Sequence, residues 1–454
     1  MSLRPGDCSL DARVEAAKLA IADESWDTAI AKCKKVLEHS PGHEEASLLK
    51  AFALRSRGRD HDLDEAETTL QLGLKRNPDS VALLTERGNL AAKRKRWPIA
   101  EFHYQRALAL ERHDTDAAVG LAEVFSATHR EEEAQSLLEA VQTQHPEDPE
   151  IALPLGWALL DNGDAERAIG QFERVPSQAS MAYSATLGLA AAHLVSHRYA
   201  KAKEVLVQAI KDFPNNLYAM SNLAWTLALE EKDLDEAEKR CREVLGRRPD
   251  HAAALECLGV VYSHRKRIAA AELYFRQAIE ADRSNPRFPT QIGFFFLQVD
   301  DLRSAQSSFD QAIGLNPTYD LALLGRGATS YALGDYRSAL RDFRRAAALR
   351  SRSAHAAVGV ALSLARLGRL EDASSSLIRS LETVDSADSW RVRLALAQIL
   401  VQTGEEVNDP DLFGDALAQA EKALEDRRRQ VARRHDDVSA PPVKPIAMSI
   451  RLPA

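Results

Sequence analysis

The hydrophobic residues of this chain recur in blocks of about 34 residues, and each block holds two stretches with helical spacing. Between Leu255 and Tyr262, apolar or small residues follow the i, i+3, i+4, i+7 pattern of one helix face. A second stripe runs from Ala271 through Phe275 to Ala278. A short polar segment separates the two stripes. The block therefore predicts two helices joined by a tight turn.

One alanine marks the same place in every block. It follows the polar turn and lies near the start of the second helix, at Ala29, Ala66, Ala100, Ala134, Ala168, Ala202, Ala237, Ala271, Ala305, Ala339, Ala373 and Ala416. Eight of the eleven spacings are 34 residues, and the others are 35, 37 and 43. Proline follows many of the second helices, where its ring cannot continue the helical hydrogen bonds. The chain is therefore expected to grow by repetition of one helical pair.

These repeats resemble the tetratricopeptide repeat family. In the 34-residue frame of that family, position 8 is small, position 20 is alanine and position 24 is a large side chain, which we call the plug. Position 8 is Ala or Gly from Ala17 to Ala361. The small residues at positions 8 and 20 are expected to face each other, because a larger side chain would wedge the helices apart. The aromatic plugs are Tyr104, Phe172, Phe275, Phe309 and Phe343.

The resemblance covers residues 10–435 and implies an all-α fold, a right-handed α-solenoid superhelix of about twelve stacked helix-turn-helix units. Residues 1–9 are expected to form an N-terminal extension and residues 10–385 eleven repeats. Residues 386–435 are expected to form an irregular twelfth helical pair with a wide loop at 405–411 and a polar capping helix. Residues 436–454 contain four prolines and no helical period, which predicts a flexible tail.

Composition and charge narrow the function classes. No apolar run is long enough to cross a bilayer, and acidic residues near the N-terminus leave no apolar core for a signal peptide. The four cysteines include no C-x-x-C pair. We therefore expect a cytoplasmic protein without membrane insertion. The net charge of −8 argues against specific nucleic-acid binding.

Motifs for catalysis are absent: the chain has no G-x-S-x-G, Walker A, H-E-x-x-H or EF-hand sequence. We expect neither enzymatic activity nor a cofactor. His193 and His197 lie one helical turn apart, a spacing that can hold a metal, but no third ligand accompanies them in the sequence. A packed or solvated pair is favoured, so no metal site is predicted.

Basic clusters at 341–352 and 427–434 lie among many acidic residues, which favours solvated helix faces over contacts with an acidic protein, an anionic surface or nucleic acid.

The resemblance also implies a binding surface, because positions 2, 5, 9, 12 and 13 of the first helix line the concave face in this family. In repeats one to four, seven of 20 such positions are charged, Asp116 and Glu123 among them. In repeats five to eleven only five of 35 are charged, Glu150 among them. This charge-poor stripe predicts a groove for an apolar segment of a protein or peptide. Its expected contact residues are Trp157, Leu187, Leu194, Tyr218, Trp225, Val260, Phe294, Leu297, Leu324 and Tyr331.

Two alternatives concern the same stripe. Tight coiling would bury these side chains between adjacent first helices, or the tail at 441–453 would fold into the groove.

The carboxylate clamp with which some members of the family bind chaperones is missing, since Thr85 stands where the clamp needs lysine.

We expect a non-enzymatic scaffold or adaptor that binds protein partners. The alternative is a structural or assembly subunit of a larger machine, such as a secretion, pilus or polysaccharide export complex. The sequence leaves the partner and the oligomeric state open, a homo-oligomer included.

Overall fold

The computed structural model describes residues 7–128, 130–177, 181–231, 233–350, 352–384, 388–407 and 410–435. Across these ranges the regular structure is entirely helical, which confirms the predicted all-α class. The expected tail at 436–454 lies outside the described residues. The chain divides into two compact units, Met1–Gly188 and Leu189–Ala454, and each is described by itself. The division falls inside helix α11 (Ala182–Val195).

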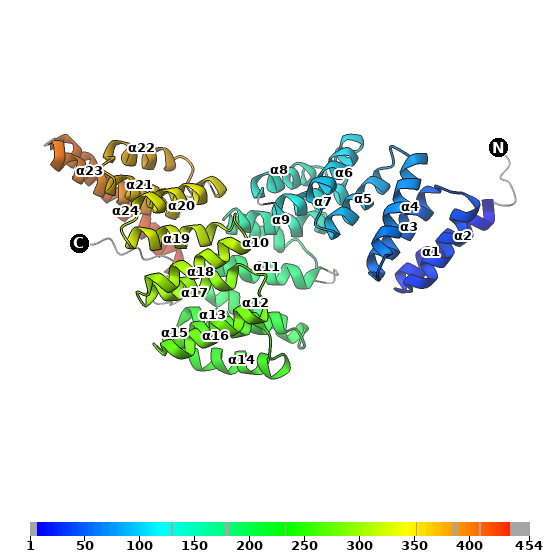
Figure 1. The fold of residues 1–454 in the computed structure, drawn as a ribbon, viewed down its shortest axis with the longest axis horizontal. Helices are drawn as coiled ribbons and strands as arrows, with labels where there is room; N and C mark the ends of the chain where they lie inside the picture. Colours follow the sequence, from blue (N-terminus) through cyan, green and yellow to red (C-terminus); the bar gives the residue numbers. More distant parts are fainter. Residues whose placement is uncertain are drawn as a thin grey trace. The chain divides into compact units, whose positions relative to one another are not determined.

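In the first unit each helix packs on the next, and the odd-numbered helices also pack on one another (Figure 1). Helix α3 contacts α5, α5 contacts α7, and α7 contacts α9, so the first helices of successive repeats form one continuous layer. The helices are α1 (Asp7–Ala22), α2 (Trp26–His39), α3 (Glu44–Arg57), α4 (Asp62–Arg76), α5 (Val81–Lys93), α6 (Trp97–Leu110), α7 (Thr115–Ala127), α8 (Glu131–Gln142), α9 (Pro149–Asp161), α10 (Ala165–Phe172) and the start of α11.

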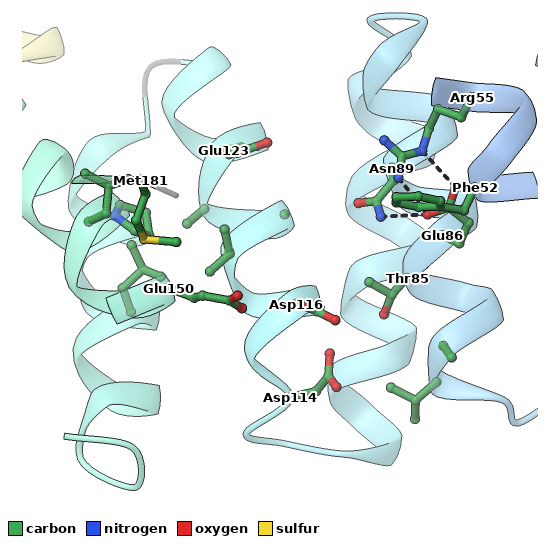
Figure 2. Close-up of a pocket in the computed structure, with 18 of the residues that line it drawn as sticks. Phe52, Arg55, Thr85, Glu86, Asn89, Asp114, Asp116, Glu123, Glu150 and Met181 are labelled. Atoms are coloured by element: carbon green, nitrogen blue, oxygen red, sulfur yellow. Dashed lines mark hydrogen bonds and ion pairs between the residues drawn. The ribbon is translucent and has the colours of Figure 1, made fainter. Parts of the chain in front are cut away.

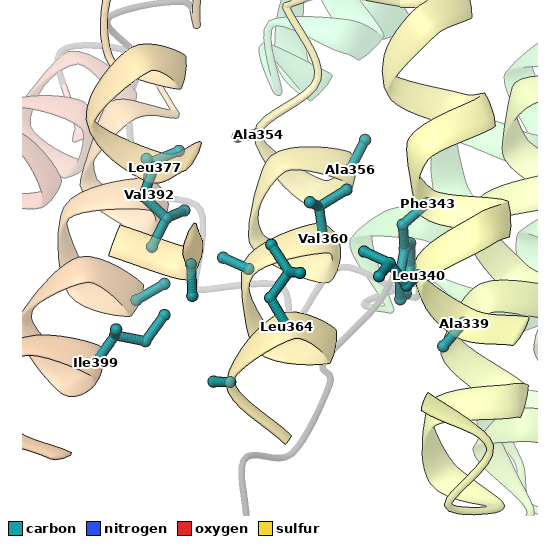
Figure 3. Close-up of a cluster of buried hydrophobic side chains, with 14 of the residues drawn as sticks. Ala339, Leu340, Phe343, Ala354, Ala356, Val360, Leu364, Leu377, Val392 and Ile399 are labelled. Carbon is teal, nitrogen blue, oxygen red and sulfur yellow. The ribbon is translucent and has the colours of Figure 1, made fainter. Parts of the chain in front are cut away.

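The second unit repeats this arrangement, with contacts from α13 to α15 and onward through α23 along the layer of odd-numbered helices. From α19 to α23 its buried side chains form one cluster: Figure 3 shows Val360 and Leu364 of α21 between Phe343 of α20 and Val392 of α23. The helices that follow α11 are α12 (Tyr199–Asp212), α13 (Leu217–Glu230), α14 (Leu234–Arg247), α15 (Ala252–His264), α16 (Ile268–Ala281), α17 (Arg287–Gln298), α18 (Leu302–Leu315), α19 (Asp320–Ala332), α20 (Tyr336–Leu349), α21 (Ala354–Arg366), α22 (Leu370–Ser380), α23 (Ser389–Val407) and α24 (Pro410–His435).

The plug residues explain why position 8 is small. A Cβ atom added to Gly88 would lie 2.5 Å from the ring of Tyr104, and one added to Gly120 in the next first helix would lie equally close. Phe309 is held in the same way between glycines of two successive first helices. The nearest neighbour of position 8 is therefore the plug, whereas the sequence had suggested the alanine at position 20. After four of the five aromatic plugs, a glycine at position 6 of the following repeat belongs to the same packing unit, whereas Gln291 occupies that position after Phe275.

The turn between the two helices of a repeat also has a common geometry. Wherever the structure describes position 15 of repeats one to eleven, it has a positive φ, from 53° to 87°, whether it is glycine, as at Gly163 and Gly334, or a residue with a side chain, as at Lys95 and Lys266. His197 occupies this turn position with φ 59°, and its Nδ1 lies 3.1 Å from the hydroxyl of Tyr199. In the described part of the chain, no group of three or more His, Cys, Asp or Glu side chains is arranged to hold a metal.

The last two helices differ from the sequence expectation. The wide loop predicted at 405–411 is shorter, because α23 continues to Val407 and α24 begins at Pro410. These helices have 19 and 26 residues, so part of the longer final spacing is taken up by helix rather than by loop. Proline at the first helical position suits the start of α24. Among the described residues, we find no helix with the length and apolar character needed to span a membrane.

Candidate functional site

The first helices of the first unit enclose a groove of about 1300 Å³, shown in Figure 2. Its walls come from α3, α5, α7, α9 and the start of α11, which are successive members of the odd-numbered layer. Apolar side chains line part of it, including Phe52, Val119, Leu153 and Trp157. Eight carboxylates also line it: Glu44, Glu86, Glu111, Asp114, Asp116, Glu123, Glu150 and Asp161. The groove is thus both partly apolar and strongly acidic.

One wall is a fixed polar network that starts at a plug residue. The hydroxyl of Tyr104 donates to Asn89 Oδ1 at 2.7 Å, and Asn89 Nδ2 donates to Glu86 Oε2 at 3.0 Å. Arg55 completes the network, with Nε and Nη2 donating to the two oxygens of Glu86 at 2.7 and 3.0 Å. Its guanidinium also lies 5.2 Å from the ring centroid of Phe52. Arg55 is the one Lys or Arg in the described lining, and Glu86 already neutralises it.

The opposite wall carries carboxylates without such partners. Asp116, Glu123 and Glu150 make no ion pair within the described residues. In Figure 2, Asp114 and Asp116 extend from α7 toward the helix that carries Thr85. Partial loss of water between the groove walls raises the pKa of Glu123, and the same effect, with the charges of Asp114 and Asp148, raises the pKa of Asp116.

Local helix chemistry positions this acidic wall. The carboxylate of Asp114 accepts a hydrogen bond of 2.8 Å from the backbone N–H of Ala117 and so caps the start of α7. Asp116 lies in the first turn of the same helix, where a negative charge is favoured by the helix dipole. Glu150 lies in the first turn of α9, which Asp148 caps in the same way. Good caps for two neighbouring helices therefore bring several negative charges to one end of the groove.

The ten residues predicted from the sequence do not all lie together. Trp157 and Leu187 belong to the first unit and the other eight to the second. Of the ten, Trp157 lines the groove described above. In the second unit, Val260, Phe294 and Leu324 are buried, and Tyr218 is exposed. The half-buried members of the set are Trp157, Leu187, Leu194, Trp225, Leu297 and Tyr331.

The aromatic residues at position 9 have a structural partner. The ring of Trp157 packs edge-on against the plug Phe172, with centroids 5.3 Å apart. Phe294 packs on the plug Phe309 in the same manner at 5.1 Å. Trp225 belongs to a repeat whose plug is Cys241, and the guanidinium of Arg287 lies 5.4 Å from its ring centroid instead. Position 9 therefore supports the plug in two repeats and holds a cation in a third.

Arg287 connects Trp225 to a buried acid. Its guanidinium donates to Glu256 Oε1 at 3.1 Å and lies 2.7 Å from Oε2. The Glu256 side chain is completely buried, and this burial raises its pKa to about 6 despite the opposing effect of Arg287. The second unit thus neutralises its inner acid with an arginine from the next repeat.

Sequence reasoning placed the binding surface where charge is scarce and passed over the acidic positions. Asp116, Glu123 and Glu150 were all identified as concave positions, but their shared sign was not used. A run of acidic residues at concave positions of two successive repeats was the signal available. Its importance depends on the open groove, which the sequence does not show.

Two family profiles, both described as tetratricopeptide repeat, match the chain: one at residues 20–86, 91–153 and 130–192, the other at 187–239, 226–286 and 329–382. Together they cover most of the chain.

Two curated proteins are similar over shorter stretches. The human protein O-mannosyl-transferase TMTC3 is 28% identical over 124 residues, which are 27% of this chain and 13% of that protein. The TPR repeat-containing protein PA4667 of Pseudomonas aeruginosa is 27% identical over 170 residues, 36% of this chain and 28% of that protein. The chain therefore spans less than a third of the length of these curated relatives.

Among solved structures, yeast Tom70 aligns with 91% of this chain and 99% of its own, at 14% identity and a TM-score of 0.44. The Cut9–Hcn1 hetero-tetramer of APC/C aligns with 93% of this chain and 95% of the matched chain, at 14% identity and a TM-score of 0.43.

Proposed function

This chain belongs to the tetratricopeptide repeat family, and from that premise we propose that it binds a segment of a protein partner in the groove of its first unit. Proteins of this family are generally interaction scaffolds without enzymatic activity. The observation that carries the proposal is the open volume of about 1300 Å³ between the first helices of successive repeats. Pockets for small molecules mostly enclose about 300–1,000 Å³, so this groove suits a length of polypeptide better than a metabolite.

Contacts within the chain itself already order the groove walls. Tyr104 anchors α5 by its ring between Gly88 and Gly120 and by its hydroxyl on Asn89. Arg55 on α3 is tied to Glu86 on α5, which joins two successive repeats across one wall. Walls that are already ordered lose little conformational entropy on binding, which favours affinity. This pre-organisation supports a binding surface rather than a loosely packed gap.

The predicted residues of the second unit form a further part of the proposal. Tyr218 is 55% exposed, and Trp225 and Tyr331 are half-buried, so their side chains are accessible to a partner. Val260, Phe294 and Leu324 lie beneath the surface and support it. We propose that the accessible members of this set contact an apolar part of a partner.

A photo-crosslinking amino acid placed at Val119 or Ser126 tests the groove directly, since both residues line it. The control position is Leu72, which is 55% exposed on α4 and is absent from the lining. We expect both groove positions to capture the same segment of the same protein in cells of the source organism, and Leu72 not to capture it. Equal capture from all three positions, or none from the groove, would refute the proposal.

A further inference from the structure

The electrostatics of the groove point to the chemistry of its partner. Eight carboxylates line it against one arginine, and that arginine is held by Glu86 in a two-point ion pair. Asp116, Glu123 and Glu150 have no cationic partner within the described chain. A ligand that brings positive charge would relieve this repulsion, whereas an acidic ligand would increase it.

A second observation marks the same space. Thr85 lines the groove from α5, is only 6% exposed, and has no hydrogen-bond partner for its Oγ1 in the described part of the molecule. Figure 2 shows its hydroxyl near the space into which Asp114 and Asp116 extend. An unsatisfied buried hydroxyl is costly unless a ligand completes its hydrogen bonding. The α5 wall, like the acidic wall, therefore carries a polar group that has no partner within the described residues.

The apolar part of the lining distinguishes between the kinds of cationic ligand that the groove could bind. A metal ion would need several ligands converging on one point, and no such group of three exists among the described residues. A small polyamine would meet the charges but would cover little of the exposed parts of the Phe52 and Trp157 rings, which are both half-buried. A peptide supplies both kinds of side chain. In an extended peptide, successive side chains point to opposite sides, so one set can meet the acidic wall of α7 and α9 and the other the apolar residues of α3.

We infer that the groove binds an extended basic peptide segment, whose lysine or arginine side chains meet Asp116, Glu123 and Glu150. This inference rests on the proposed function and names the chemistry of the partner at that same site. The apolar side chains of the segment lie beside Phe52.

The test is a selection from a random library of 12-residue peptides displayed on phage, with the full-length chain as the target. Selected peptides are then synthesised, and their dissociation constants are measured by fluorescence anisotropy. We expect the selected peptides to carry a net positive charge. Their affinity should fall about tenfold or more between 50 and 300 mM salt, because contacts between exposed charges are screened.

Three variants separate the possible outcomes. Ala82→Trp fills the groove without changing its charge, because Ala82 is exposed in the lining. The triple variant D116N/E123Q/E150Q removes three groove charges without changing side-chain size. The control, E38Q/E147Q/E173Q, removes three exposed charges of the same unit outside the lining. We expect the first two to weaken binding about tenfold or more and the control less than about twofold.

The two proposals fail in different ways. If no selected peptide is sensitive to Ala82→Trp, the groove is not a peptide site and the proposed function fails there. If peptides are sensitive to Ala82→Trp but are neutral or acidic, or are unaffected by the triple variant, only the basic partner is refuted. All variants are compared with the parent chain by circular dichroism, so that loss of folding is recognised.

Two other possible occupants of the groove, the chain's own tail and a second copy of the chain, are each tested by a separate measurement. A chain that ends at residue 435 should bind the peptides as the full chain does. A gain of about tenfold on truncation would show that the chain's own tail occupies the groove and would overturn the inference. Sedimentation analysis provides the last test. Self-association that the triple variant abolishes would assign the acidic wall to a second copy of this chain.

Discussion

Two residues at the same repeat position, one in each unit of this molecule, have opposite environments. Val119 in the first unit and Leu324 in the second both occupy position 5 of a first helix. Val119 is half-buried in the wall of an open groove, whereas Leu324 is 4% exposed and belongs to a hydrophobic cluster with Phe343 and Val360. For this pair, the same concave position lies at the surface of a groove in one unit and in the core in the other. Family numbering indicates where a side chain points, but the size of its neighbours decides whether a partner can reach it.

The two units also contain acidic side chains that differ in whether an arginine neutralises them. In the second unit Glu256 is buried and is neutralised by Arg287 from the next repeat. In the first unit Asp116 and Glu123 stay in contact with water and have no cation beside them in the described chain. A buried charge must be paired, because removing it from water is costly, whereas a charge in an open groove stays hydrated without a partner and is accessible to a ligand. Glu256 is thus neutralised within the second unit, whereas Asp116 and Glu123 of the first unit remain available to a ligand.

Truncation at position 5 should give the largest difference between the units. Leu324→Ala removes buried methyl groups from the cluster around Phe343 and should lower the free energy of unfolding by about 3 kcal/mol. Val119→Ala should cost less than about 1 kcal/mol, because part of that side chain already faces water. Urea unfolding followed by circular dichroism measures both. Equal losses would break the comparison.

The buried acid of the second unit should make stability depend on pH. The pKa of Glu256 in the folded chain is about 6, above its ordinary 4.5, so the folded state binds this proton more tightly than the unfolded state. Its contribution to stability is therefore complete below pH 4.5 and falls as pH rises toward 6, by about 2 kcal/mol in total. In Glu256→Gln this contribution is absent.

The measurement is the free energy of unfolding of both proteins between pH 4 and pH 8. We expect the value for Glu256→Gln, relative to that of the parent chain, to rise between about pH 4.5 and pH 6 and then to level off. The pKa of about 6 already includes the opposing effect of Arg287, and below that pH the Glu256 side chain of the parent chain is neutral, as the glutamine is. A difference that stays constant across the range would contradict the assignment.

The polar wall of the first unit predicts a smaller effect. Tyr104→Phe keeps the ring between Gly88 and Gly120 but removes the hydroxyl that donates to Asn89. We expect a loss of about 1 kcal/mol, together with faster hydrogen exchange in α5, since Asn89 also positions Glu86. Unchanged exchange in α5 would show that the network does not order this wall.

The turns are where the two units should behave alike. Gly163 in the first unit and Gly334 in the second both have φ above 80°, a conformation that a Cβ atom disfavours. Replacing either by alanine should cost about 1 kcal/mol. Gly314→Ala is the matched control, because it lies inside α18 with no atom near the added Cβ, and it should stabilise the chain by about 0.5–1 kcal/mol. Thermal unfolding of the three variants checks these signs.

Local patterns were sufficient to predict the helices and their pairing. Apolar spacing located the two stripes between Leu255 and Ala278, and they correspond to α15 and α16. The small residues at position 8 and the aromatic plugs were also readable, because each repeat must solve the same packing problem. The second glycine at position 6 was missed, since its neighbour is the plug of the preceding repeat.

The binding surface was harder to predict, because it depends on how much space successive repeats leave between them. Trp157 was predicted as a concave residue and does line the groove. Phe294 shares its repeat position but is 9% exposed and packs on Phe309. Nothing in the two local sequences distinguishes these outcomes, because the difference arises from side chains in neighbouring repeats.

By itself, the sequence determined that this protein is a chain of helical pairs built on a 34-residue period, since helix spacing, turn chemistry and plug size are all local properties. Only the tertiary structure decided which concave positions are open. It closed the layer over Leu324 and left a groove beside Val119. The physical reason is that accessibility belongs to the space between repeats, and the side chains of several helices fill or leave that space together.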